Sequence, residues 1–294
     1  MATLSVAVES LLAQDFGDFE LVIFDDCSDH ATREALRALA AADPRIRLVL
    51  NEIRLGPWEN FAHALKAVEP RRYFMWASQD DYWSPNWLST HVARLETERF
   101  GAAFGRVIIV DEANQEIGTN LSNQRAFPYM QSRSPCDRRW RYALQPEYFG
   151  KGNAMYSLFR TDLLRSLHLF PTSAPIPLPY DFDIVRRFLA RYPIACSPEA
   201  TFYKRVHKAS NGQNKPDVLP VGPISVFHHL EPVLPGSLKK LVRDDCFWVD
   251  RYLLAEPRVG PMERVLLEAK LLRTLCRGIK DRVRVVAKML LDRT

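Results

Sequence analysis

Two short apolar segments, each leading into a pair of aspartates, constrain most strongly what this chain can fold into. Residues 20–24 (ELVIF) run into Asp25 and Asp26, and residues 73–77 (YFMWA) lead, after Ser-Gln, into Asp80 and Asp81. Runs this short and apolar on both faces predict buried central strands of a parallel sheet. The carboxyl ends of such strands share the edge where α/β proteins bind ligands, so both pairs are expected to face one cleft.

Four carboxylates in one cleft repel one another unless a cation or hydrogen-bond donors compensate, and this favours a bound metal. No G-x-G-x-x-G or P-loop follows these strands, so a diphosphate ligand would lack the usual cradle of backbone N–H groups. Mg²⁺ or Mn²⁺ clamped between carboxylates and phosphate oxygens is the other solution. The five cysteines show no C-x-x-C spacing, which argues against a structural zinc site and for a reduced, cytosolic protein.

An aspartate after a strand can also be a helix N-cap, and that alternative applies to each pair separately. After the first pair, Ser28 or Asp29 could cap the helix that follows. The second pair fits capping less well, because Ser84 and Pro85 already supply a cap and a first-turn proline for the next helix.

The first hundred residues alternate between strand and helix patterns, which predicts a nucleotide-binding type of α/β fold. The expected helices are 6–14, 31–41, 58–68 and 85–96, and a further strand is expected at 46–50. Later elements are a hairpin at 106–118, a surface loop at 119–141, a strand at 153–159, a helix at 180–191 and two short strands in 194–206. A shift to prolines near residue 215 divides the chain into a domain, 1–214, and a helical C-terminal extension, 215–294.

The net charge of +5 is confined to one end of the chain. Residues 261–294 carry nine basic and four acidic side chains, an excess of five, so the remainder is neutral and no nucleic-acid partner is expected. Apolar residues in this tail recur every three or four positions, which predicts a basic amphipathic helix. It would bind an anionic membrane surface or pack on the catalytic domain. No leader or membrane-spanning stretch is visible, so the expected location is cytoplasmic, or peripheral on the inner face of the membrane.

Several segments resemble the family-2 glycosyltransferases. Residues 9–29 are similar to the family's opening, S-L-L-x-Q followed by F-E-L-I-V-V-D-D-G-S-T-D, with Cys27 in place of the glycine. Later blocks match in order: Asn51 with Gly56 and Asn60, Asp80-Asp81-x-Trp83-x-Pro85, Tyr180-Asp181-Phe182-Asp183, and Tyr203-Lys204-Arg205-Val206-His207-x-x-Ser210. Tyr180 stands where a glutamate often precedes the later aspartate. The resemblance covers about residues 5–212.

The resemblance implies a GT-A type α/β fold with a mostly parallel sheet and flanking helices. It implies metal-dependent, inverting transfer of a sugar from a nucleotide-diphosphate donor to a hydroxyl of a cell-surface glycan or lipid-linked acceptor. By position, Asp26 would bind the nucleotide base with Asp25 beside it, and Asp80 would contact the ribose or assist the metal. Asp81 and His207 would hold the metal, and Asp181 would be the catalytic base. The alternative is that Asp183 is the base and Asp181 a helix cap.

Two other functions compete with this one. A transferase-like module could bind nucleotide or glycan without turnover, although Asp26, Asp80, Asp81 and Asp181 are all present. A metal phosphohydrolase with Asp25 as nucleophile is the third candidate, and the absence of a D-x-D-x-T pattern argues against it.

Family members normally begin with an apolar strand and a P-x-Y-N type turn, whereas here only a few residues precede the first helix. In the implied fold that strand lies in the middle of the sheet, so its absence is expected to leave the backbone edge of residues 20–24 exposed. We therefore expect either that Met1 is not the natural start or that another segment fills the gap.

Overall fold

The computed structural model describes residues 2–119, 128–144, 151–169 and 180–206. The helices are α1 (Ala2–Leu12), α2 (His30–Ala42), α3 (Pro57–Ala67), α4 (Trp87–Thr97), α6 (Pro135–Leu144), α7 (Thr161–Arg165), α8 (Tyr180–Arg191) and the 3-10 helix η2 (Lys151–Tyr156). The strands are β1 (Leu21–Asp25), β2 (Ile46–Leu50), β3 (Tyr73–Phe74), β4 (Tyr82–Trp83), β5 (Ala102–Val110), β6 (Glu116–Thr119), β7 (Leu158–Arg160) and β8 (Ile194–Arg205). The predicted boundary near residue 215 and the C-terminal extension lie outside these residues.

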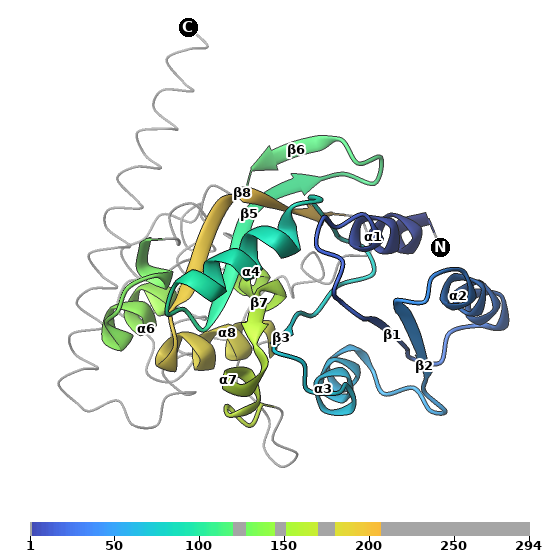
Figure 1. Ribbon diagram of the computed structural model, residues 1–294, viewed down its shortest axis with the longest axis horizontal. Helices are drawn as coiled ribbons and strands as arrows, with labels where there is room; N and C mark the ends of the chain where they lie inside the picture. The colour runs from blue at the N-terminus through green and yellow to red at the C-terminus, as the bar shows by residue number, and fades with distance from the viewer. Residues whose placement is uncertain (1, 120–127, 145–150, 170–179, 207–294) are drawn as a thin grey trace, which may run out of the picture.

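The strands form two sheets. β1 and β2 pair in parallel, with Leu21 opposite Ile46 and Asp25 opposite Leu50. The larger sheet has the order β3-β7-β5-β8-β4, with β6 paired to β5. Figure 1 shows the β1–β2 pair beside α2 and apart from β5 and β8, which run side by side. Among the described residues only the β1–β2 and β5–β8 ladders are parallel and four are antiparallel, so the sheet is mixed, where a mostly parallel one was expected.

The two apolar runs that precede the aspartate pairs do not share a sheet, contrary to expectation. The second run contributes only Tyr73 and Phe74 to a strand, antiparallel to β7. The chain then leaves the ladder because Trp76 turns into the core, where its ring contacts Phe74 and Phe159 and its Nε1 donates to the carbonyl of Phe61 at 3.1 Å. Aromatic packing therefore ends this strand.

β1 has one strand neighbour in the described part of the chain, with β2 on one side and no strand on the other. Its first four residues, from Leu21 to Phe24, are correspondingly only half-buried. An edge of this kind leaves backbone donors and acceptors without ladder partners.

The core lies under the long strands of the larger sheet. β5 is buried along most of its length, and α4 covers it with Trp87, whose ring meets the rings of Phe104 and Phe202. From the other direction α8 inserts Phe188, which packs edge-to-face on Phe159. Pairs of this geometry add to the stabilisation from apolar burial. The core therefore fixes the ends of β8 and α8 relative to each other.

Three local expectations need correction. Residues 194–206 form the single strand β8, in which a bulge shifts the register with β5, so that the partner of Gly105 is Ser197 but that of Arg106 is Thr201. Residues 153–159 are mainly the helix η2 followed by β7. The predicted surface loop 119–141 contains the start of α6, which is anchored because buried Arg138 donates to the carbonyls of Leu189 and Ser132. The hairpin of β5 and β6 is confirmed.

The helices that follow the two aspartate pairs are not capped by those pairs. Asp29 caps α2, since its Oδ1 accepts from the backbone N–H of Thr32 at 2.7 Å. Helix α4 begins at Trp87, and Ser84 instead accepts from the backbone N–H of Thr201 in β8. In the described part of the chain no helix is both long and apolar enough to cross a bilayer.

A buried histidine in α4 makes stability pH-dependent. His91 is fully buried against the ring of Trp87, and burial lowers its pKa to about 3. Below pH 6.5 His91 is therefore protonated in the unfolded chain but neutral in the folded protein. The free energy of unfolding consequently falls as the pH falls. Between pH 7 and pH 5 we expect a loss of about 2 kcal/mol in the free energy of unfolding from this group. Urea unfolding of His91→Leu at both pH values should lack that loss, whereas His30→Gln, an exposed site, should retain it.

Candidate active site

Asp25, at the end of β1, is buried, and its partners come from the segment between β1 and β2. Its Oδ2 accepts from Nε of Arg33 in α2 at 2.8 Å, and the backbone N–H of Ser28 points at both carboxylate oxygens. The same arginine donates through Nη2 to the carbonyl of Asn51 at 2.8 Å. Asp25 therefore ties β1, α2 and the end of β2 together, and its charge is compensated by Arg33.

Asp26 organises the loop that follows β2. Its Oδ1 accepts from the backbone N–H of Leu55 at 2.7 Å and from Nδ2 of Asn51 at 3.1 Å, and its Oδ2 accepts from the N–H of Gly56 at 2.8 Å. Gly56 has a φ of 89°, which favours glycine, and directly precedes α3. Partial burial disfavours the charge, but these hydrogen bonds outweigh it and hold the pKa of Asp26 below its ordinary value.

The second pair contacts β8. Asp81 is 0% exposed; its Oδ1 accepts from the backbone N–H of Arg205 at 2.9 Å and its Oδ2 from Nζ of Lys204 at 2.9 Å. Burial raises the pKa of Asp81 to about 6, although Lys204 opposes this shift. Burial also disfavours the Lys204 ammonium, but Asp81 more than offsets it and raises the lysine pKa. At neutral pH the two groups form an ion pair. Asp80 is half-buried and accepts from the hydroxyl of Ser78.

Asp181 lies in the first turn of α8 and packs closely on η2. A Cβ added at Gly152 would lie 2.8 Å from Cγ of Asp181 and 2.8 Å from a ring carbon of Phe182. At the end of η2, the hydroxyl pKa of Tyr156 is raised by burial first and also by three carboxylates, while Lys204 opposes the shift. Those carboxylates are Asp80, Asp81 and Asp181. Asp81 thus lies against Lys204 of β8 and Asp181 against Gly152 of η2, while Asp25 and Asp26 are held by a separate set of contacts.

Asp183, the alternative base, lies in a different environment. It is buried, and Nη2 of Arg186 and Nε of Arg187 lie 2.5 and 2.7 Å from its carboxylate oxygens. Both partners come from the same helix, α8. The Asp183 carboxylate is therefore engaged in ion pairs within its own helix.

An aromatic stack joins the two sets of aspartates. The ring of Trp58 in α3 lies on the ring of Tyr180, with centroids 5.1 Å apart and an interplanar angle of 28°. Tyr180 immediately precedes Asp181, and α3 begins at the loop that Asp26 holds. The residue that replaces the family's glutamate thus connects the β1–β2 unit to α8.

The predicted metal site does not fit the described residues as they are arranged. Both oxygens of Asp81 accept from protein donors, and no group of three His, Cys, Asp or Glu residues in the described part of the chain could hold a metal ion. His207 lies outside the described residues. The carboxylate charge that suggested a metal is compensated instead by Arg33, Lys204 and backbone N–H groups.

Lys204 and Tyr156 are the residues that sequence reasoning missed. Lys204 belongs to the block 203–207 that carried the family resemblance, and that block was the available signal. Tyr156 fell in a segment predicted as an ordinary strand, and no local pattern marks it. Lys204 reaches Asp81 only because β4 pairs with β8.

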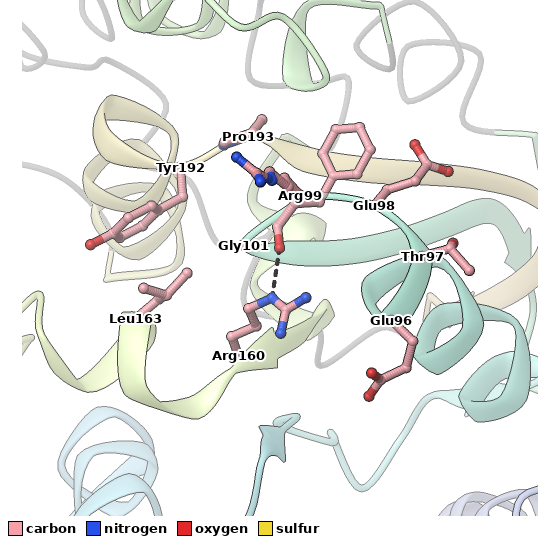
Figure 2. Close-up of a pocket in the computed structure, with 10 residues that line it drawn as sticks. Glu96, Thr97, Glu98, Arg99, Gly101, Arg160, Leu163, Tyr192 and Pro193 are labelled. Carbon is pink, nitrogen blue, oxygen red and sulfur yellow. Dashed lines mark hydrogen bonds between the residues drawn. The ribbon is translucent and has the colours of Figure 1, made fainter.

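The structure also has a pocket of about 460 Å³ away from these residues. Figure 2 shows it between the end of α4, with Glu96 and Thr97, and Tyr192 after α8, with Arg160 of β7 between them. Nε of Arg160 donates to the carbonyl of Phe100 at 2.9 Å, which ties β7 to the turn before β5. None of the predicted site residues lines it, so this pocket is not the candidate active site.

The packing of Gly152 on Asp181 gives a direct test of that aspartate's placement. Gly152→Ala should push the carboxylate away, and a displacement of about 1 Å in a reacting group lowers turnover by about a hundredfold. Sugar transfer would be measured with thermal unfolding as a fold check. Gly118→Ala, where an added methyl meets nothing within 4 Å, is the matched control and should leave transfer unchanged. Equal turnover in the two variants would contradict a role for Asp181 at this position.

Comparison with known proteins places this geometry in a family context. A family model described as glycosyl transferase family 2 matches residues 2–160. A putative colanic acid biosynthesis glycosyl transferase, WcaA of Escherichia coli (strain K12), is 33% identical over 87 residues, 30% of this chain and 31% of that protein. WfgD of Escherichia coli, a UDP-Glc:alpha-D-GlcNAc-diphosphoundecaprenol beta-1,3-glucosyltransferase, is 28% identical over 123 residues, 42% of this chain and 47% of that protein. The chain thus spans less than half the length of both curated relatives.

A solved structure shares the fold. Residues 1–349 of S. aureus TarS in complex with UDP-GlcNAc superpose with a TM-score of 0.53 at 15% sequence identity, covering 93% of this chain and 78% of that one. At this identity the likeness shows the fold alone. The α/β architecture with a curled, mixed sheet and flanking helices is therefore that of the GT-A glycosyltransferases, as expected.

Proposed function

This chain belongs to glycosyl transferase family 2, and from that premise we propose that it transfers a sugar from a nucleotide-diphosphate donor to a hydroxyl of a glycan or lipid-linked acceptor. The observation that carries the proposal is that a chain of this family places Asp81 against Lys204 of β8 and Asp181 against Gly152 of η2. Similar proteins support the substrate classes: the TarS structure is a complex with UDP-GlcNAc, and WfgD is a UDP-Glc:alpha-D-GlcNAc-diphosphoundecaprenol beta-1,3-glucosyltransferase.

In the proposed reaction Asp181 is the catalytic base. It takes the proton from the acceptor hydroxyl while that oxygen attacks the anomeric carbon, and the bond to the nucleoside diphosphate breaks on the opposite face, inverting the configuration. The alternative, Asp183, is held inside α8 by Arg186 and Arg187, and these contacts are those of a structural ion pair. No covalent enzyme intermediate is needed.

The donor's nucleotide is assigned to the aspartates at the end of β1 and before β4. Asp26 would accept from the base, with Asp25 holding the turn beside it, and Asp80 would contact the ribose. The support is positional, since Asp26 lies at the carboxyl end of β1, where α/β folds bind nucleotides.

Dependence on Mg²⁺ or Mn²⁺ through Asp81 and His207 remains part of the sequence-based hypothesis. The contacts of Asp81 do not favour it, so no step of the proposed reaction passes through a metal.

The rival is a module that binds nucleotide or glycan without turnover. A thermal-shift screen of nucleotide-sugars separates binders from non-binders, because a ligand that binds only the folded state raises the Tm. We expect a UDP-sugar to raise it and UMP to raise it less. The sugar that stabilises most would then be incubated with a lipid-linked acceptor and followed by mass spectrometry. Stabilisation without transfer or hydrolysis would favour the module instead.

We also propose a cytoplasmic enzyme bound peripherally to the inner face of the membrane through residues 261–294. The support is their excess of five positive charges and their apolar repeat. Flotation with anionic liposomes should recover the whole chain and much less of a chain that ends before Pro261. Neutral liposomes are the control. Equal recovery of the two chains would contradict the membrane role of this segment.

A further inference from the structure

The pair formed by Lys204 and Asp81 is unequally exposed. The side chain of Asp81 is 0% exposed, whereas that of Lys204 is 27% exposed, with 2.9 Å between Nζ and Oδ2. A ligand that reaches this point therefore meets the ammonium, with the carboxylate behind it.

The strand pairing holds the ammonium in place. β4 directly follows Asp81 and pairs with β8, with Tyr82 opposite Tyr203 and Trp83 opposite Phe202. The rings of Tyr82 and Tyr203 stack with centroids 4.5 Å apart and an angle of 8°, and the guanidinium of Arg205 lies over Tyr82. Because Lys204 lies between Tyr203 and Arg205, both of which are fixed by these contacts, little freedom is lost when it binds a ligand.

We propose that Lys204 is the resident cation of this site, held by Asp81 and facing the diphosphate of the donor in place of a divalent metal. The inference rests on the proposed function, because it presupposes a nucleotide-diphosphate donor. When the bond to the anomeric carbon breaks, negative charge grows on the leaving diphosphate oxygen, and Nζ donates hydrogen bonds to it. Charge-assisted hydrogen bonds of this kind are the strong ones, and preorganised donors are worth most in a partly dry site.

Competition with a metal provides the first test and needs no nucleotide. Free Mn²⁺ would be titrated with the full chain and followed by its electron paramagnetic resonance signal. We expect no Asp81-dependent binding in the wild type. Lys204→Met should gain a Mn²⁺ site that Asp81→Asn/Lys204→Met lacks, because removal of the ammonium frees Oδ2. Wild-type Mn²⁺ binding that Asp81→Asn abolishes would overturn the inference.

Nucleotide binding provides the second test, with UDP as the probe and calorimetry in EDTA. We expect the wild type to bind UDP without metal, Lys204→Met to bind at least about tenfold more weakly, and Lys204→Arg to stay within about threefold. Equal affinity of the wild type and Lys204→Met, or wild-type binding only with Mn²⁺, would overturn the inference. Lys204→Met leaves the buried carboxylate of Asp81 unpaired and could lose UDP by unfolding. The double variant Asp81→Asn/Lys204→Met has no such unpaired charge and therefore serves as the folding control.

The two tests separate this inference from the proposed function. If UDP binds neither in EDTA nor with Mn²⁺, the proposed donor is wrong. The Mn²⁺ titration then still decides whether Lys204 pairs with Asp81 in place of a metal. If UDP binds in EDTA and depends on Lys204 but no sugar is transferred, the inference stands and the transferase proposal fails.

Discussion

Asp181→Asn is expected to lower the rate of sugar transfer by about two to four orders of magnitude and to leave donor affinity nearly unchanged. An amide cannot take the acceptor's proton, but it has almost the shape of the carboxylate and keeps the packing against Gly152. The rate would be followed as release of nucleoside diphosphate at saturating donor, and donor affinity by calorimetry. A variant that loses both together would show that Asp181 holds the donor and is not the base.

Asp183→Asn is the matched control, because it makes the same substitution two positions further along α8 in a different environment. It removes the charge that Arg186 and Arg187 contact in the buried part of α8. We expect lower thermal stability and little change in the chemical step of the folded fraction. If Asp183→Asn instead abolishes transfer with stability intact, the two roles must be exchanged.

Asp81→Asn should be the more damaging change for the fold. It leaves the partly buried ammonium of Lys204 without its counter-charge, and breaking such a pair from one side is costly. Because Lys204 is partly exposed, water recovers some of that cost, and we expect a loss of about 2 kcal/mol in the free energy of unfolding.

Urea unfolding measures this effect, and the surface pair of Arg37 and Glu34 provides a control. Both of those side chains are at least half exposed, so Glu34→Gln should change stability by less than about 0.5 kcal/mol. A loss for Asp81→Asn no larger than that of the control would mean that the buried pair contributes nothing to folding.

Local sequence patterns predicted the helices and strands that form through interactions between residues close in sequence. The apolar run before Asp25, the hairpin of β5 and β6 and the helix after Tyr180 all appear in the structure because alternation, turn residues and helical spacing act within a few residues. The strand predicted at 73–77 is shorter in the structure. Trp76 packs in the core against Phe159, a residue distant in the sequence, and leaves the strand ladder. Sequence reasoning had no access to that contact.

The same distinction applies to the site. The chemistry of clustered carboxylates required compensation by a cation or by hydrogen-bond donors, and the sequence could not say which. Lys204 is 123 positions from Asp81, and only the pairing of β4 with β8 brings them together. Asn51 and Gly56 were recognised only as members of a family block, and their hydrogen bonds to Asp26 depend on the turn geometry after β2.

The separation of the β1–β2 pair from the larger sheet gives the site two parts of different stiffness. A single five-residue ladder with an open edge resists deformation far less than β5, which is paired along its length. The aspartate assigned to the nucleotide base belongs to the compliant part, and Lys204 and Asp81 belong to the rigid one. Such a division lets the base end adapt to different nucleotides while the geometry at the breaking bond stays constant. Donor preference could then diverge among relatives through the loop after β2 without any change at the reacting centre.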